Sequence, residues 1–269
     1  MSNKMKLIDL LIEKDYFQDE KEAKGYIMAG KVYVKNEIID KPGTLVDINS
    51  EIKIKDLNKK YVGRGGIKLE WALKSFDIEV ENKVIIDAGA STGGFTDCLI
   101  KHGAKMVYAV DAGYGQLAGK LRNNDKVKNM EKTNISEVNN MNLNPTPEMA
   151  TVDLSYLSLK KAIPIFEKII SEDGEMICLI KPLFEVEDSE IRRKGKIKRQ
   201  IIYKKVLINL IDHIKNIHDL RIRGLTHSPI KGNRGTKEFF VFVSKNKELS
   251  NMKNIKNKVD QVINSILGI

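Results

Sequence analysis

The chain has 269 residues, of which 42% are hydrophobic and 30% are charged, and its net charge is +10. This size and composition are typical of a soluble protein with one large and one small domain, and no apolar run approaches the ~18 residues of a membrane-spanning helix. The positive charge favours a polyanionic partner.

The first 60 residues predict a small α+β domain. Acidic residues interrupt the N-terminal apolar stretch MSNKMKLIDLLIEKDYF, which argues against a signal peptide and predicts a cytoplasmic protein. Apolar spacing predicts two helices, Met5–Glu13 and Glu20–Ala29, followed by small strands at Lys31–Val34, Glu37–Ile39 and Glu51–Ile54. We therefore expect three parts: a first domain over residues 1–58, a linker over residues 59–62 and a second domain over residues 63–269.

The second domain opens with a pattern typical of a nucleotide-type cofactor loop. The run VIIDAGASTGGF, residues 84–95, reads as a buried strand followed by a turn with three glycines, Gly89, Gly93 and Gly94. A helix from Thr96 and a second strand, Met106–Asp111, complete a βαβ unit. Asp111 lies about 20 residues beyond the glycines, where such units place an acid that binds a ribose hydroxyl. An ordinary strand-to-helix turn is the alternative.

The loop chemistry favours S-adenosylmethionine as the cofactor. The spacing Gly89-x-x-x-Gly93-Gly94 departs from the G-x-G-x-x-G of dinucleotide sites. Asp87, at the end of the first strand, would also repel a pyrophosphate but suits a cationic ligand. The two cysteines, Cys98 and Cys178, fall in an apolar helix and an apolar strand, so we expect core residues and neither a disulfide nor a metal site.

The remaining pattern predicts an α/β fold with a doubly wound, seven-stranded sheet whose last strand is antiparallel. The expected strands are Val84–Asp87, Met106–Asp111, Val127–Met130, Met149–Asp153, Met176–Lys181, Asp219–Thr226 and Glu238–Ser244. The clearest helices are Ser158–Ile170, Arg199–Ile217 and Met252–Ile266.

Four polar residues should meet at one edge of this sheet. Asp153 and Lys181 follow parallel strands, whose carboxyl ends bind ligands in open α/β sheets. Glu238 begins an antiparallel strand and so reaches the same edge, and Lys68 lies on the helix opened by GRGG. Two lysines and two carboxylates would share a cleft, unless they only form ion pairs at strand ends.

The proposed chemistry is attack of an RNA ribose 2′-hydroxyl on a sulfonium methyl group. Burial and a neighbouring cation favour the neutral amine of a lysine, which is the form that accepts a proton. In this interpretation Lys181 takes or stabilises the hydroxyl proton and Asp153 orients that lysine. Lys68 and Glu238 hold the ribose.

A basic run, RRKGKIKRQIIYKK at residues 192–205, has eight basic and no acidic side chains. It predicts contact with a phosphate backbone through Arg192, Arg193 and Lys194, and a solvated helix face is the alternative.

Two resemblances extend this interpretation. Residues 5–54 resemble the S4-like (α-L) RNA-binding module of ribosomal and RNA-modifying proteins. That resemblance implies RNA contacts at Lys6, Lys14, Lys21, Lys24, Lys31 and Lys35.

The motifs GRGGIKLEWAL, DAGASTGGFTDCL, AVDAGYGQL, TVDLSYLSL, IKPLFE and GNRGTKEFFVF closely resemble the TlyA (haemolysin A-like) family of rRNA cytidine-2′-O-methyltransferases. Their catalytic half is similar to FtsJ-type enzymes with a Rossmann-like, S-adenosylmethionine-dependent fold. The resemblance implies a catalytic tetrad of Lys68, Asp153, Lys181 and Glu238, and an RNA contact at Arg64. It implies a cofactor site made by Asp87, Gly89, Ser91, Thr92, Gly93, Gly94, Phe95, Asp111 and Asn134.

Two departures and three open questions accompany the resemblance. Leu183 stands where family members usually carry glutamine, and a second departure is Gly63, which begins GRGG where SRGG is often found. The family name raises haemolytic activity as an alternative, and a noncatalytic RNA-binding or ribosome-assembly factor is another. The sequence also leaves open whether 16S rRNA, 23S rRNA or both would be the substrate within ribosomal subunits.

Overall fold

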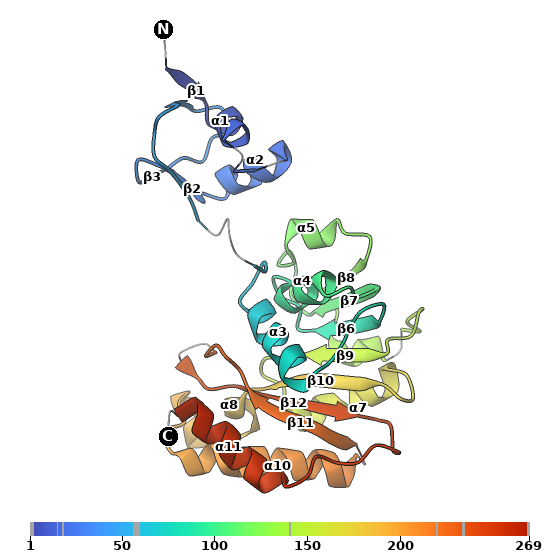
Figure 1. The fold of residues 1–269 in the computed structure, drawn as a ribbon. Helices are drawn as coiled ribbons and strands as arrows, with labels where there is room; N and C mark the ends of the chain where they lie inside the picture. Colours follow the sequence, from blue (N-terminus) through green and yellow to red (C-terminus); the bar gives the residue numbers. More distant parts are fainter. Residues whose placement is uncertain are drawn as a thin grey trace. The chain divides into compact units, whose positions relative to one another are not determined.

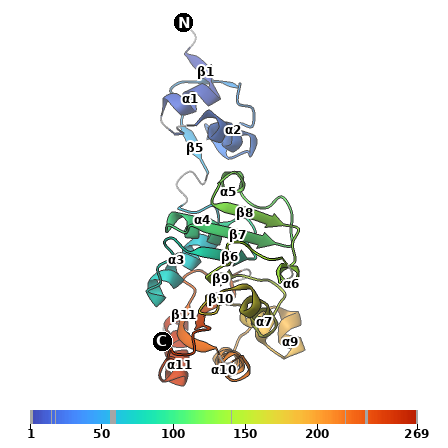
Figure 2. The same ribbon diagram turned by 90° about the vertical axis from the view of Figure 1, so that its right-hand side faces the viewer.

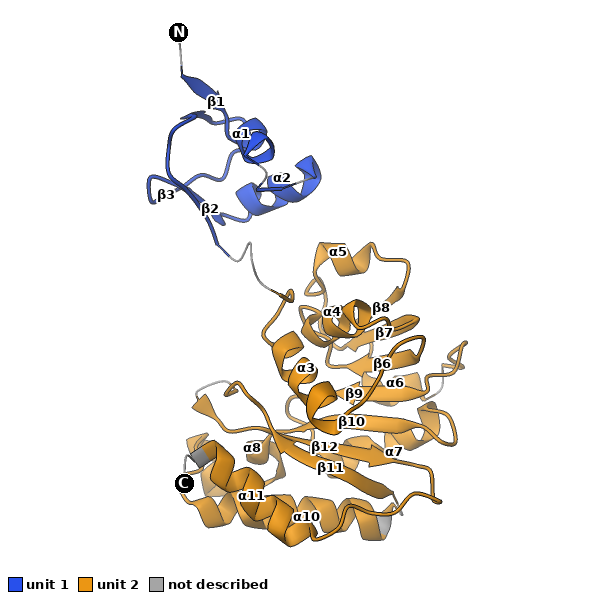
Figure 3. Cartoon of the chain, in the orientation of Figure 1, with its two compact units in different colours: residues 1–59 blue, residues 60–269 orange. Residues whose placement is uncertain are grey.

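The computed structural model describes residues 3–14, 16–17, 19–55, 60–139, 141–218, 220–232 and 235–267. The chain forms two compact units, Met1–Lys59 and Lys60–Ile269, coloured separately in Figure 3. Of the predicted linker over residues 59–62, Lys59 lies outside the described residues. Tyr61 is buried in the core of the second unit, and Val62 packs against another cluster of that unit.

The first unit packs two helices, α1 (Leu7–Glu13) and α2 (Glu20–Met28), against small strands. Its core is made by apolar residues of both helices and of the strands, among them Leu7, Leu10, Leu11, Ala23, Ile27, Val32 and Ile52. The Asp19 side chain caps α2 by accepting a hydrogen bond from the Lys21 backbone N–H at 3.0 Å. This arrangement confirms that the segment folds into two helices and a sheet.

The strands of this unit differ in part from the prediction. Strands β2 (Val32–Val34), β3 (Glu37–Ile38) and β5 (Ile52–Ile54) form the expected small sheet in the order β3-β2-β5. Met5 and Lys6, predicted as helix, instead lie in β1 (Lys4–Lys6), because β1 pairs antiparallel with β4 (Leu45–Asp47). Neither three-residue strand is long enough to show an alternating pattern.

A seven-stranded sheet forms the centre of the second unit, as predicted, in the order β11-β12-β10-β9-β6-β7-β8 (Figure 1). The parallel strands are β6 (Val84–Ala88), β7 (Met106–Asp111), β8 (Val127–Glu131), β9 (Met149–Val152) and β10 (Glu175–Ile180). Strand β12 (Phe239–Ser244) pairs antiparallel with both β10 and β11 (Arg221–His227). The predicted antiparallel last strand is confirmed. Asp219, the expected start of β11, lies outside the described residues.

Helices cover both faces of this sheet because its central strands are apolar on both sides. Helices α3 (Gly65–Phe76) and α4 (Gly94–Lys101) pack against Ile85, Ile177 and Phe240. They lie on the left of the sheet in Figure 2, and α7 (Leu159–Ile169) lies on the right.

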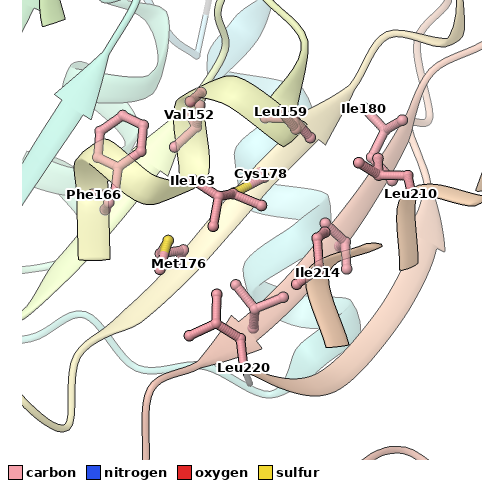
Figure 4. Close-up of a cluster of buried hydrophobic side chains, with 14 of the residues drawn as sticks. Val152, Leu159, Ile163, Phe166, Met176, Cys178, Ile180, Leu210, Ile214 and Leu220 are labelled. Carbon is pink, nitrogen blue, oxygen red and sulfur yellow. The ribbon is translucent and has the colours of Figure 1, made fainter. Parts of the chain in front are cut away.

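The opposite face carries the largest core cluster, to which α7, α10 (Gln200–Ile217) and α11 (Ile255–Leu267) contribute. Figure 4 shows part of it, with Phe166 and Ile163 of α7 beside Met176 and Cys178 of β10, and with Leu210 and Ile214 of α10 in the same cluster. Cys98 and Cys178 are buried free thiols in the two cores, as expected.

Four short helices were not predicted: α5 (Gly119–Arg122), α6 (Ile135–Val138), α8 (Pro182–Glu185) and α9 (Ser189–Lys194). Elements of four to six residues span too little chain to show a helical period. None of the helices among the described residues is both long and apolar enough to cross a membrane.

Candidate active site

A cavity of about 260 Å³ lies at the carboxyl edge of the parallel strands. It brings together all four residues of the predicted tetrad, which come from α3, the ends of β9 and β10, and the segment before β12. The lining residues are Arg64, Gly65, Lys68, Gly89, Ala90, Ser91, Thr92, Gly94, Phe95, Asp153, Lys181, Gly232 and Glu238.

Lys68 and Glu238 form one ion pair of the cavity. Their Nζ and Oε2 atoms are 2.5 Å apart, and the side chains are only 11% and 5% exposed. Burial raises the pKa of the Glu238 carboxyl, and the charge of Lys68 opposes this shift. Asp153 raises the same pKa and Lys181 lowers it, so the four groups act on one another electrostatically. Removing one partner would leave the other nearly buried and unpaired.

Lys181 and Asp153 form the second ion pair, with 2.6 Å between Nζ and Oδ1. The Lys181 Nζ also donates a hydrogen bond to Ser155 Oγ at 3.0 Å. Sequence reasoning missed Ser155, although its place two residues after Asp153 was a usable signal. The Asp153 carbonyl oxygen accepts a further hydrogen bond at 3.5 Å, so three oxygens from one loop fix the position of the lysine ammonium group.

Two glycines of the loop after β6 are required by geometry. Gly89 has φ +83°, and a Cβ there would lie 2.5 Å from the Asp153 carbonyl oxygen. Gly93 has φ +93°, and a Cβ there would lie 2.2 Å from Leu121 Cδ1. Positive φ strains other residues, and contacts this short cannot be accommodated without movement. The loop can therefore lie directly against Asp153 only because glycine is present.

Asp87 lies beneath this loop and is not among the residues that line the cavity. Its carboxylate is fully buried and accepts hydrogen bonds from Thr96 Oγ1 at 2.6 Å and Thr151 Oγ1 at 2.9 Å. Burial raises the pKa of Asp87 to about 7, while the two threonine hydroxyls lower it. These contacts tie the start of α4 to β6 and β9, so Asp87 supports the loop from below.

The predicted ribose ligand, Asp111, organises the neighbouring loop. It accepts hydrogen bonds from the backbone N–H groups of Ser91 at 2.8 Å and Gly113 at 2.7 Å. Glu131, which sequence reasoning missed, accepts the N–H groups of Gln116 at 2.6 Å and Leu117 at 3.1 Å. These two carboxylates together shape the segment that follows β7.

Asn134 lies near this segment and caps α6. Its Oδ1 accepts the Ser136 backbone N–H at 3.1 Å, and the preceding Thr133 N–H donates to the Asp111 carbonyl at 3.0 Å. Asn134 is exposed and does not line the cavity. Leu183, one departure from the family pattern, does not line it either.

Of the predicted RNA contacts, only Arg64 lines the cavity. On the first unit, Lys6, Lys14, Lys21, Lys24 and Lys35 are exposed, and the half-buried Lys31 lies over the Tyr26 ring with 5.2 Å from Nζ to the ring centroid. Arg192, Arg193 and Lys194 are exposed at the end of α9. The basic run is therefore not one helix face, since it spans α9, a loop and the start of α10.

Helix α8 holds the loop that carries Asp153 and Ser155, a role that sequence reasoning also missed. The buried carboxylate of Glu185 accepts hydrogen bonds from Ser158 Oγ at 2.6 Å and Leu159 N at 2.7 Å. Burial raises the pKa of Glu185, and both hydrogen bonds oppose this shift. The adjacent Phe184 ring lies 5.3 Å from the Tyr156 ring. Glu185 thus connects the ends of β9 and β10, and its place in the KPLFE motif was the available signal.

We expect Glu185→Ala to slow the chemical step about 10- to 100-fold, because small displacements of reacting groups cost this much. Cofactor affinity should change less than about two-fold, since the glycine loop is untouched. Single-turnover methyl transfer and calorimetric titration of the cofactor measure the two effects. Glu185→Gln keeps an acceptor for Leu159 N and should restore most of the rate. Glu187→Ala, at an exposed neighbour, is the control. Equal losses in rate and cofactor affinity would contradict the positioning role.

The cavity suits the predicted cofactor, S-adenosylmethionine. Asp153 lines the cavity and Asp111 holds Ser91 of the glycine loop, and these carboxylates favour a cationic, phosphate-free ligand over a pyrophosphate. Glycines let a ligand approach the backbone at residues 89–94. Across the part of the chain that the structure describes, no cluster of three or more His, Cys, Asp or Glu side chains could hold a metal ion.

Comparison with known proteins agrees with this arrangement. The FtsJ-like methyltransferase family matches residues 61–245. A Bacillus subtilis protein named "Putative rRNA methyltransferase YqxC" is 39% identical over 241 residues, which cover 89% of this chain and 85% of that protein. The 16S/23S rRNA (cytidine-2'-O)-methyltransferase TlyA of Mycobacterium tuberculosis is 32% identical over 87% of each chain. The solved structure of a "Putative hemolysin" from Streptococcus thermophilus superimposes with a TM-score of 0.71 at 35% identity, covering 100% of this chain and 98% of that one.

Proposed function

Since this chain belongs to the FtsJ-like methyltransferase family and to its TlyA group, we propose that it methylates the 2′-hydroxyl of a cytidine ribose in ribosomal RNA. S-adenosylmethionine is the proposed methyl donor. The observation that carries this proposal is the convergence of two lysine–carboxylate pairs beside a glycine loop in one cavity. The rRNA substrate is taken from the relatives named above.

Lys181 is the proposed proton acceptor. S-adenosylmethionine supplies a methyl group on a positively charged sulfur when it is bound. The substrate hydroxyl would displace the methyl group from this sulfur, which would leave as a neutral thioether. Lys181 Nζ would take the hydroxyl proton after its ammonium form has released one proton to solvent. Asp153 and Ser155 hold Nζ in place at 2.6 and 3.0 Å. Because both contacts come from one loop, the amine points at one position in the cavity, which contributes orientation to the rate.

The other residues bind and orient. The Lys68–Glu238 pair lies in the same cavity and is assigned to the ribose. The cofactor is assigned to the backbone of Gly89, Ser91, Thr92, Gly94 and Phe95. Asp87 stabilises this loop by accepting a hydrogen bond from Thr96, and Gly93 allows the loop to pack against Leu121. Asp111 is assigned to the cofactor ribose and Asn134 to its adenine end.

Methyl transfer to ribosomal RNA tests this function directly. Purified small and large ribosomal subunits are incubated with the protein and methyl-labelled S-adenosylmethionine, and the RNA is digested to nucleosides. We expect label in 2′-O-methylcytidine from at least one subunit. Label in a base, or no label despite calorimetric evidence of cofactor binding, would reject the proposal.

The first unit is proposed to dock on folded RNA through its lysines. Lys21 and Lys24 are exposed on α2, where phosphate contacts would position the protein without reading sequence. We expect the double substitution of Lys21 and Lys24 by alanine to weaken RNA binding. The slope of log affinity against log salt should fall by about 2, because each phosphate contact contributes about 0.9.

Binding to isolated rRNA at several salt concentrations measures this effect. Lys41→Ala, at an exposed lysine of the same unit outside the proposed set, is the matched control. An unchanged salt slope would remove this pair from the RNA surface.

A membrane-lysing role is not supported by the described helices, none of which could span a bilayer. An activity on ribosomal subunits would place the protein in the cytoplasm.

A further inference from the structure

Helix α3 exposes an apolar surface beside the cavity. Trp71, the only tryptophan of the sequence, is 37% exposed, and Ile67 is 43% exposed. The two residues are four positions apart, so they lie on the same side of the helix. Tryptophan is enriched at binding surfaces, where its large ring contributes strongly to contacts.

His227, at the end of β11, extends this surface. Its ring centroid lies 5.3 Å from that of Trp71, with 48° between the planes. The His227 Nδ1 lies 3.2 Å from Ser265 Oγ of α11, which fixes the ring. Burial lowers the pKa of His227, so the imidazole is neutral at physiological pH and presents an uncharged face.

The Trp71–His227 pair lies directly beside the reacting groups. Trp71 is three residues after Lys68, which is one helical turn, and Lys68 pairs with Glu238. His227 pairs with Phe239 across the β11–β12 ladder, and the next residue, Ser228, donates its N–H to the Glu238 carbonyl at 2.9 Å. Strand β11 is the edge strand, four places from β6 in the sheet. The pair therefore lies on the side of Lys68–Glu238 away from the cofactor loop.

Positive charge accompanies the aromatic pair. Lys237 donates a hydrogen bond to the Ile266 carbonyl at 3.4 Å, next to the Ser265 that holds His227. Its pKa is lowered by burial and by the charge of Lys231. Lys231 is exposed. Arg64, which lines the cavity, is three residues before Ile67 in the sequence. An occupant of this surface is therefore expected to be anionic as well as aromatic.

We propose that Trp71 and His227 form a stacking site for an unpaired base of the substrate RNA. This base belongs to a nucleotide adjacent to the one whose ribose enters the cavity, and Lys231 and Lys237 contact its phosphate. The proposal rests on the proposed RNA methyltransferase function and adds a second nucleotide position to it. Base stacking on aromatic side chains combined with lysines along the backbone is the usual chemistry of single-stranded RNA binding.

The single tryptophan makes this site observable without a label. A single-stranded oligocytidylate of about six nucleotides, within the usual length range of such sites, is titrated into the full-length protein while tryptophan emission is recorded. We expect saturable quenching, because a stacked base contacts the Trp71 ring. No quenching at concentrations that saturate RNA binding by filter retention would overturn the proposal.

Variants test the contribution to catalysis. Trp71→Ala should raise the KM for ribosomal RNA about 10-fold, the effect expected for loss of one stacked base, with kcat and cofactor affinity nearly unchanged. Trp71→Phe keeps an aromatic face and should restore most of the KM. Met141→Ala, at a similarly exposed apolar residue outside the proposed RNA-contacting segments, is the matched control.

The outcomes separate this proposal from the proposed function. If the wild-type protein methylates no ribosomal RNA, the function fails, and the fluorescence titration still decides whether the aromatic pair stacks a base. If methylation occurs but Trp71→Ala leaves the RNA KM unchanged, the stacking site is rejected. A change in sedimentation of Trp71→Ala with unchanged RNA KM would instead assign the surface to a contact between protein copies.

Discussion

Lys181→Ala is expected to reduce methyl transfer about 1,000-fold while cofactor affinity stays within about two-fold of wild type. The lysine lies 2.6 Å from Asp153 and 3.0 Å from Ser155 Oγ, and removing a positioned proton acceptor costs 10²- to 10⁴-fold. Single-turnover transfer to ribosomal subunits measures the rate, and calorimetry measures cofactor binding. The rate should fall without a matching change in RNA affinity, since the lost interaction is with the reacting hydroxyl.

Lys181→Arg separates two roles of this residue. Arginine keeps a cation beside Asp153 but does not release its proton in proteins, so it cannot act as a base. We expect it to be nearly as inactive as alanine, whereas recovery of the rate would mean that Lys181 acts only by its charge. Lys83→Ala removes a different lysine–carboxylate pair, with Glu175 at 3.4 Å, at the amino-terminal ends of β6 and β10. That control should leave the rate unchanged.

Gly89→Ala is expected to weaken cofactor binding at least 100-fold and to lower thermal stability. The added Cβ would lie 2.5 Å from the Asp153 carbonyl oxygen at a φ of +83°, so the loop and the Asp153 backbone would have to separate. A strained non-glycine residue of this kind costs about 1–3 kcal/mol before the steric contact is counted. Calorimetric titration with S-adenosylmethionine and thermal unfolding measure the two effects.

Two other glycines of the same unit provide controls. Gly115 also has a positive φ, +70°, but a Cβ there would meet no described atom within 4 Å. Gly115→Ala therefore reports strain without a steric contact. Gly119, the first residue of α5, has neither feature, so Gly119→Ala should be close to neutral. Equal effects at Gly89 and Gly115 would show that strain alone, and not the approach to Asp153, determines cofactor binding.

The main strands of the second unit could be predicted from sequence because each is a long apolar run buried on both faces. Val84–Asp87 and Met106–Asp111 were predicted to within one residue of β6 and β7. General rules of α/β topology then placed the carboxyl ends of the parallel strands, and the start of an antiparallel last strand, at one edge of the sheet. Those rules brought Lys68 to Glu238, 170 positions away.

The roles of individual polar groups could not be predicted in the same way. Periodicity gives the end of a strand but not whether its last carboxylate faces a cavity or the core. Asp87 was expected among the cofactor ligands, yet Thr96 and Thr151 enclose its carboxylate. Glu185 reaches Ser158 across 27 positions through a four-residue helix that has no sequence signature. Such contacts depend on distances that only the folded chain sets.

The position of β12 has a consequence for biosynthesis. This strand is the last of the sheet to leave the ribosome, yet it lies between β10 and β11 and not at an edge. A nascent chain that ends before Glu238 contains Lys68, Asp153, Lys181 and the glycine loop, but it lacks the partner of Lys68. Until β12 is inserted between β10 and β11, the edge of β10 that β12 will cover has no partner strand. The catalytic group is therefore completed only after Glu238 and β12 have been translated, and pairing across such sequence distances is a slow step in folding.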